Sequence, residues 1–450
     1  MAYEVIVVGG GIGGLTAAAV LARRGLNVCL LERQSEVGGC AATVEHLRYR
    51  FDPTYGLHSG WEPGGVYERL CEQLAVAVPQ ARELSRPYVV RLPDGSDVPR
   101  PNSERDFQSD LRSSFPECAE AAVNFYRDLH GAKNTSTIHS NTWAAQMVDG
   151  SSRFRDFVDI QLRTLTQSSL CELSYELAAK ALAPDRRFWS IEGGTQTLIN
   201  LLAESFQHSG GKLRLNAPVL RLAYGSEGSP VGVDLLSGER VLFTRAVISN
   251  LTVWDTYGKL VGPARTPRAI SSDLRQLTGW GIYQMFLTLT DEAVAALPAD
   301  KILAVTNGED GDAPERQLIF CLGQNAGEGK RTAVVSVYTR AEDWFSFHED
   351  HTALEEREQS MLETTWARLN SALPQVTAGA ELIETATPHT YYENVRRRFG
   401  MVGRPSATLT GKLTSAAASN LWLVGDTVAG GFGIDDVVES ARCIAYQIAQ

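Results

Sequence analysis

The sequence predicts an α/β fold in which a nucleotide-binding unit, built from both ends of the chain, is interleaved with an antiparallel sheet and helices. Three observations predict it. The chain opens with an apolar strand, a glycine-rich turn and an Ala-rich helix, the order of a βαβ unit. It closes with another strand, a Gly-Asp turn and a helix, and its middle holds apolar runs that alternate as in half-buried strands.

The opening unit has a strand predicted over residues 4–8 and a helix over residues 15–24. Gly9, Gly11 and Gly14 fill three glycine positions between and within them. The first allows a tight turn, the second lets the backbone approach a pyrophosphate, and the third packs helix against strand. Because the helix N-terminus offers free N–H groups to phosphates, Ile12 and Gly13 belong to the predicted site as well.

A second strand, residues 27–31, ends at Glu32, where an acid is needed to accept hydrogen bonds from an adenosine ribose. Arg33 follows, and the pair Gly38 and Gly39 leads to Cys40. A glycine pair shortly beyond the acid resembles the extended FAD motif of glutathione-reductase-like and amine-oxidase-like flavoproteins, which NAD enzymes normally lack. The predicted fold class is therefore α/β, with a Rossmann-like FAD-binding domain of the glutathione-reductase type.

Composition bounds the function. The 450 residues are 44% hydrophobic and 21% charged, as in an ordinary globular protein, and the net charge of −11 argues against a nucleic-acid partner. Contact with a membrane surface is not excluded.

No stretch approaches the roughly 20 apolar residues of a spanning helix, and the first strand leaves no room for a signal peptide, so a cytoplasmic location is expected. The seven cysteines form no CxxC pair, and no metal-ligand spacing is evident.

The middle of the chain is predicted in blocks. Residues 67–183 read as mostly helical, and a helix over 196–208 follows the Glu192-Gly193-Gly194 turn. Strand-like pieces come next, over residues 212–222, 231–236 and 246–250. An antiparallel sheet is predicted from the alternation over residues 282–289, 317–322 and 332–338, with one helix over residues 352–373.

The last strand, residues 420–424, runs into Gly425 and Asp426. Asp426 is expected near the pyrophosphate or the ribityl hydroxyls. The helix over 434–449 begins after a glycine-rich turn, so Gly433 and Ile434 are expected to bring its amide end toward the flavin N1 and C2 carbonyl. Negative charge develops there when the ring is reduced.

Together these motifs, with Ser249-Asn250 and Thr387-Pro388-His389-Thr390-Tyr391, resemble the phytoene desaturase and carotenoid isomerase family, a branch of the FAD-dependent amine-oxidase-like superfamily. The resemblance runs almost end to end. It implies a discontinuous FAD domain of residues 1–66, 186–255 and 405–450, a substrate-entrance region of residues 67–185, and a substrate-binding sheet with helices over residues 256–404. It also implies an apolar tunnel to the flavin, cofactor contacts from the Val219 backbone and from Asn250, and peripheral membrane binding.

The chain departs from this family at two places. Many relatives have Arg where this chain has Cys40, so a charge-assisted phosphate contact is missing or moved. Asp435 and Asp436 stand at the start of the last helix, where the family has apolar or small residues. They either cap the helix or lie close to the ring, where they would disfavour its anionic reduced form. The shorter chain also favours a substrate smaller than a full carotenoid.

The predicted function is an FAD-dependent oxidoreductase that carries out desaturation, or related redox or isomerisation chemistry, on a small apolar substrate of isoprenoid or polyene type. The flavin itself accepts hydride, so no catalytic side chain is assigned. FAD is expected to be non-covalent, because no cysteine lies between Asn420 and Ser440. Two alternatives stay open: an amine or amino-acid oxidase, and a non-catalytic prenyl-binding protein of the GDP-dissociation-inhibitor type. The sequence does not determine the oligomeric state.

Overall fold

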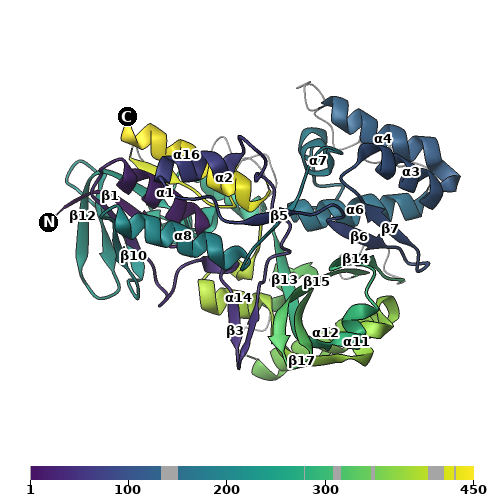
Figure 1. The fold of residues 1–450 in the computed structure, drawn as a ribbon. Coiled ribbons are helices and arrows are strands. Elements are labelled where there is room, and N and C mark those ends of the chain that lie inside the picture. The colour runs from purple at the N-terminus through teal and green to yellow at the C-terminus, as the bar shows by residue number, and fades with distance from the viewer. Residues whose placement is uncertain are drawn as a thin grey trace.

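The computed structural model describes residues 2–132, 151–277, 279–307, 316–345, 350–403, 420–429 and 432–450. Two seven-stranded sheets form the framework, and helices pack around both (Figure 1). The two termini lie at the same end of the molecule, beside the first sheet (Figure 1).

The first sheet collects strands from both ends of the chain. In the order β10-β11-β12-β1-β2-β9, with β18 beside β12, its strands are β10 (Val219–Tyr224), β11 (Pro230–Leu235), β12 (Arg240–Ser249), β1 (Tyr3–Val8), β2 (Val28–Leu31), β9 (Lys212–Arg214) and β18 (Leu421–Leu423). β1 runs parallel to β2 and β12, and β18 runs parallel to β12. The carboxyl ends of β1, β2 and β18 therefore meet at one edge, where ligands bind in open parallel sheets.

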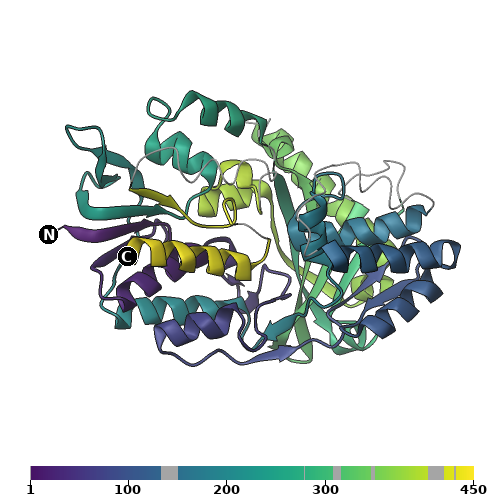
Figure 2. The ribbon, with the colours of Figure 1, turned by 90° about the horizontal axis from the view of Figure 1, so that it is seen from above.

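Helices cover both faces of this sheet (Figure 2). On one face lie α1 (Ile12–Arg23), α2 (Val66–Leu74), α8 (Thr195–His208) and α16 (Ile434–Ala449). Leu15, Leu198 and Val438 are fully buried in the core they share. The other face packs on α9 (Val253–Asp255), a π-helix (Thr256–Val261) and α10 (Arg268–Gln276). The helices predicted over 196–208 and 434–449 are confirmed.

The second sheet has the order β17-β13-β16-β15-β14-β6-β7. Its strands are β17 (Ala380–Ala386), β13 (Trp280–Thr290), β16 (Lys330–Arg340), β15 (Gln317–Gly327), β14 (Lys301–Val305), β6 (Tyr88–Arg91) and β7 (Asp97–Arg100), all antiparallel except β6 with β14. The three strands predicted in this block are confirmed. The helices in this part are α11 (Asp291–Ala295), α12 (His351–Ala372), α13 (Pro374–Ala378) and α14 (Pro388–Val395).

The stretch 67–183 differs in part from its prediction. It contains the helices α3 (Glu104–Ser114), α4 (Ala119–Ala132), α6 (Ser152–Thr166) and α7 (Tyr175–Leu182), but also the strands β5 (Ala81–Glu83), β6 and β7. β5 pairs with β8 (Trp189–Ile191), and a further hairpin joins β3 (Val44–His46) to β4 (Tyr49–Phe51). Strands of three or four residues are too short to show alternation clearly, and β6 owes its place to β14, far along the chain.

The strand piece predicted over 212–222 is two strands. β9 pairs with β2, whereas β10 pairs with β11. Between them Asn216 has a left-handed φ of 52°, and Pro218 has no N–H to donate to a ladder. Within the described ranges, no helix combines the length and apolar character that crossing a bilayer requires. The division into three domains stays a prediction.

Candidate active site

A cavity of about 850 Å³ lies where the first sheet meets the second, within the size range of small-molecule and cofactor sites. Every residue of the predicted cofactor set except Gly14 lines it. These lining residues are Gly9, Gly11, Ile12, Gly13, Glu32, Arg33, Gly38, Gly39, Cys40, Val219, Asn250, Gly425, Asp426, Gly433 and Ile434. Residues distant in sequence are thus brought around one space, although their contacts with a cofactor stay predictions.

The glycine-rich turn keeps this part of the wall free of side chains. Gly9 has φ of +100°, a conformation that glycine adopts without strain. A Cβ on Gly11 would stand 2.7 Å from Asn250 Nδ2, and one on Gly14 would stand 2.1 Å from the Gly9 carbonyl oxygen. Gly14 therefore serves the packing of α1 against β1 and does not face the cavity.

Glu32 is fixed by backbone amides at one end of the cavity. Its Oε2 accepts a hydrogen bond from Gly10 N at 2.6 Å, and its Oε1 accepts one from Gln34 N at 2.8 Å. An ionised carboxylate has about four acceptor positions, so capacity remains for ribose hydroxyls. Arg33 donates to the Glu393 carbonyl at 3.1 Å, which ties this end to α14.

Asp426 is paired with Arg397, a residue that no motif or spacing in the sequence marks. The guanidinium forms a bidentate pair, with Nη2–Oδ2 at 2.8 Å and Nη1–Oδ1 at 3.2 Å, and Nε donates to the Met401 carbonyl at 2.6 Å. Burial raises the pKa of the neighbouring Cys40 thiol, and the Arg397 charge opposes this rise. A guanidinium therefore stands beside Cys40, although it comes from position 397.

The two aspartates at the start of α16 have different roles. Asp436 caps the helix, since its Oδ2 accepts from Phe432 N at 2.8 Å, and its Oδ1 pairs with Lys180 Nζ at 2.5 Å. Asp435 accepts a hydrogen bond from Ser59 Oγ at 2.9 Å. The capping interpretation thus fits Asp436, whereas Asp435 forms a separate contact beside the cavity.

Tyr55, Tyr338 and Tyr391 form one part of the cavity wall. Tyr55 donates to Tyr338 at 2.6 Å, and Tyr391 donates to Gln284 Oε1 at 2.5 Å. Burial raises the pKa of Tyr338 to about 12, so its phenol is neutral at physiological pH. Leu165, also on the wall, adds apolar surface. Tyr391, the last residue of the motif over residues 387–391, lines the cavity, whereas the nearby aromatic residue Tyr392 does not.

His58 also lines the cavity, and its imidazole is buried. Burial lowers its pKa to about 4; Asp52 opposes this shift, whereas Lys301 adds to it. His58 is therefore neutral at physiological pH. His389, from the motif over residues 387–391, is not among the lining residues, and its ring centroid lies 5.9 Å from that of Phe345.

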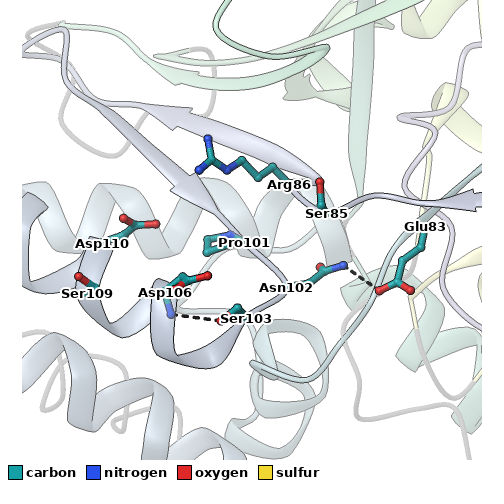
Figure 3. Close-up of a pocket in the computed structure, with 9 residues that line it drawn as sticks. All are labelled: Glu83, Ser85, Arg86, Pro101, Asn102, Ser103, Asp106, Ser109 and Asp110. Carbon is teal, nitrogen blue, oxygen red and sulfur yellow. Dashed lines mark hydrogen bonds between the residues drawn. The ribbon is translucent and has the colours of Figure 1, made fainter.

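A second cavity, of about 600 Å³, lies between β5, β7 and α3 (Figure 3). Its wall is mostly polar, with three acidic residues, Glu83, Asp106 and Asp110, and one basic residue, Arg86, and no aromatic residue lines it. Asn102 donates to Glu83 at 3.1 Å across one side (Figure 3). This cavity does not fit a dinucleotide, which carries two negative phosphates.

Comparison with known proteins decides the family. The family model for flavin-containing amine oxidoreductases matches residues 12–449. The chain belongs to this family. This flavin-dependent oxidoreductase is 26% identical over 502 aligned residues to prolycopene isomerase 2 from an Oncidium hybrid cultivar, covering 99% of this chain and 84% of the relative. It is 24% identical to human all-trans-retinol 13,14-reductase over 64% of this chain and 53% of the relative.

Among solved structures, an oxidoreductase from Methanosarcina mazei has the same fold, with a TM-score of 0.72 at 17% identity over 98% of this chain and 100% of that one. The mixed α/β fold, the flavin cofactor and the oxidoreductase class are thereby confirmed, and so is the resemblance to carotenoid isomerases. The residues present fit the cofactor, because a backbone-lined glycine turn, an acid held by backbone amides and a cation beside Cys40 surround one cavity.

Proposed function

We propose that this flavoenzyme uses FAD to introduce carbon–carbon double bonds into an apolar polyene or isoprenoid substrate by desaturation, or to reduce or isomerise double bonds already present in it. The observation that supports this most directly is a single cavity that joins the dinucleotide turn to a wall of Leu165, Ile282, Tyr338 and Tyr391. A relative matched over 99% of this chain is a prolycopene isomerase, which supports the same substrate class.

The first sheet is proposed to be the glutathione-reductase-type Rossmann domain. Its parallel strands β2, β1, β12 and β18 bring Glu32, the glycine turn and Asp426 to one edge. In this arrangement Glu32 would bind the adenosine ribose, and the α1 N-terminus with Arg397 would face the pyrophosphate. When bound, FAD supplies the redox centre that takes or returns hydride.

The protein's own contribution is then to orient the substrate and exclude water. The tyrosine hydroxyls are engaged with each other and with Gln284, so their rings offer apolar faces without leaving polar groups unpaired. Gln284 is held by Ser336 Oγ at 2.9 Å and by the Pro53 carbonyl at 3.1 Å, which fixes the wall. A rigid apolar wall can hold a polyene in one orientation relative to the ring.

The test is turnover by the purified, flavin-loaded protein. Prolycopene and phytoene in detergent micelles are incubated with oxidised or anaerobically reduced enzyme, and products are separated by chromatography. Conversion of either polyene is expected. Leu165→Glu places a charge in the apolar wall and should abolish this conversion while the flavin absorbance is retained; Glu204→Gln, on the exposed side of α8, is the control.

Amine oxidation is the second candidate, favoured by the family to which the chain belongs. Hydrogen peroxide release with diamines or benzylamine, without any change in polyenes, would establish it in place of the first. A colourless protein that binds prenylated peptide and ignores added FAD would instead identify a non-catalytic carrier.

Because apolar substrates partition into membranes, we further propose that the protein works in the cytoplasm and touches a membrane surface peripherally. The acidic net charge of −11 supports the absence of a nucleic-acid partner. Flotation of the protein with lipid vesicles tests the membrane contact. Recovery only in the vesicle-free fraction would contradict it.

A further inference from the structure

A partly buried polar network joins three segments beside the N-terminus of α16. Arg186 comes from the segment between α7 and β8 and lines the cavity. Its Nη2 lies 3.7 Å from the place that a Cβ on Gly433 would occupy. A cation from outside the first sheet therefore stands at the same point as the positive end of the α16 dipole.

Ser59 and Asp435 form a chain of hydrogen bonds with this guanidinium. Arg186 Nη2 donates to Ser59 Oγ at 3.0 Å, and Ser59 Oγ donates to Asp435 Oδ2 at 2.9 Å. Ser59 is 9% exposed, so the contact is shielded from solvent. Asp435 Oδ1 also lies 2.1 Å from the place of a Cβ on Gly433, which means that only glycine lets the carboxylate fold back here.

The groups around Asp435 shift its pKa in opposite directions. Burial raises its pKa and so does Asp436, whereas Arg186 and Lys180 lower it. From α2, Tyr67 faces the same carboxyl, and burial keeps that phenol neutral by raising its pKa. Asp436 is engaged with Lys180 and the helix cap. Burial raises the pKa of Asp436, but Lys180, the Phe432 amide and, least, Arg186 lower it overall. Asp435 is thus the acid joined to Arg186 through Ser59, and Asp436 is a neighbour whose main partner is Lys180.

We propose that Arg186 is the cation that faces the pyrimidine end of the flavin, and that Asp435, acting through Ser59, positions the guanidinium and offsets part of its charge. This rests on the proposed function only in that the cavity holds FAD. Negative charge develops at N1 and the C2 carbonyl on reduction, and a cation fixed there stabilises the reduced form. An anion behind that cation weakens the effect. No sequence signal indicated Arg186, whereas the two aspartates were already notable as departures.

The experiment measures the affinity of the apoprotein for oxidised FAD and for anaerobically reduced FAD at pH 8, by titration in each redox state. Arg186→Met should shift the ratio of the two affinities about tenfold toward oxidised FAD, or ~30 mV for a two-electron couple. Arg186→Lys, which keeps the charge, should restore most of the ratio. Circular dichroism and thermal unfolding of each apoprotein verify the fold.

Asp435→Asn tests the direction in which the ratio of the two affinities changes. Its amide oxygen still accepts from Ser59, but the charge is gone, so the ratio should shift several-fold toward reduced FAD, opposite to Arg186→Met. Because Asp435 takes up a proton as the pH falls, the affinity ratios of wild type and Asp435→Asn should converge as the pH is lowered from 8, which a merely structural role would not produce. Asp436→Asn, the control, should change the ratio less than twofold.

The proposal is overturned if Arg186→Met leaves the ratio unchanged, or if Asp435→Asn shifts it no more than Asp436→Asn does. Both outcomes leave FAD binding and polyene turnover intact, so they contradict this inference alone. Failure of the wild-type protein to bind FAD in either redox state would contradict the proposed function itself.

Discussion

Arg397 is a single residue that places a charged group beside a motif from a distant position in the sequence. Its guanidinium is 15% exposed and forms the bidentate pair with Asp426 beside Cys40. Where many relatives of the resembled family carry an arginine at position 40, a guanidinium here reaches nearly the same place from another element. If the phosphate contact has moved, Arg397 is the residue that we expect to make it.

Replacing Arg397 should weaken FAD binding by about 10- to 100-fold, the equivalent of losing hydrogen bonds between charged groups. In Arg397→Met the Asp426 carboxylate stays in the cavity without its partner and repels the pyrophosphate. Isothermal titration of the apoprotein with FAD measures this. Arg397→Lys should recover only part, because lysine cannot form the fork. The adjacent, exposed Arg398→Met is the control, and an equal loss there would contradict the assignment.

Glu32 allows a sharper test at the other end of the cavity. Glu32→Ala removes the acceptor for Gly10 N and Gln34 N as well as the proposed ribose contact. FAD affinity should fall about tenfold or more, whereas FMN, which has no adenosine, should bind as it does to wild type. Competition titrations with both flavins measure the difference. Parallel losses for FAD and FMN would show that Glu32 acts only through the shape of the turn.

The parts of the site that the sequence predicted are those whose signal is local. The glycine turn, Glu32 and the Gly425-Asp426 turn each lie next to the strand that presents them, so spacing alone placed them on the cavity wall. Arg397, Arg186 and Tyr338 reach the cavity through tertiary packing, and no spacing pattern marks such residues. Tyr391 belongs to the motif over residues 387–391, which marked the residue but not its place on the cavity wall.

At the scale of the element, the contact between α1 and β1 depends on one missing Cβ. Alanine normally stabilises a helix interior by ~1 kcal/mol relative to glycine. At Gly14 the added Cβ would lie 2.1 Å from the Gly9 carbonyl oxygen, a clash between backbone and side chain that no rotamer relieves.

Gly14→Ala should therefore destabilise the protein by about 1–3 kcal/mol or more, the usual cost of overpacking, and should weaken FAD binding by moving the turn. Urea unfolding of the apoprotein measures the free energy of unfolding. Gly258→Ala is the control, because a Cβ there meets no atom within 4 Å, and it should change stability by less than about 0.5 kcal/mol. Equal stability of both variants would contradict this account of the packing.

Element prediction failed where strands were short or depended on distant partners. The three long strands of the second sheet alternate over enough residues to be recognised, whereas β6 and β7 do not. The helix α14 was read only as a motif, since eight residues carry little periodicity. The sheet to which β6 belongs could not be predicted from its own segment, because its neighbour β14 comes from a distant part of the chain.

At the scale of the whole molecule, His58 lies where the two sheets meet. Its backbone pairs with Trp189 of β8, and its imidazole faces Asp52 and Lys301, the latter from β14 of the second sheet. A neutral imidazole enclosed at this junction makes the stability of the fold depend on pH. The dependence can be worked out from the direction of the shift.

Burial lowers the pKa of His58 from 6.5 to about 4, so the unfolded chain takes up a proton on this side chain before the folded protein does. Above pH 6.5 the imidazole is neutral in both states and costs nothing. As the pH falls from 6.5 to 4, stability is lost, at most about 3 kcal/mol from this residue. His58→Asn should flatten that part of the pH profile of urea unfolding, whereas the exposed His208→Asn should follow wild type. If the three profiles coincide between pH 4 and pH 7, the imidazole is not held neutral at this junction.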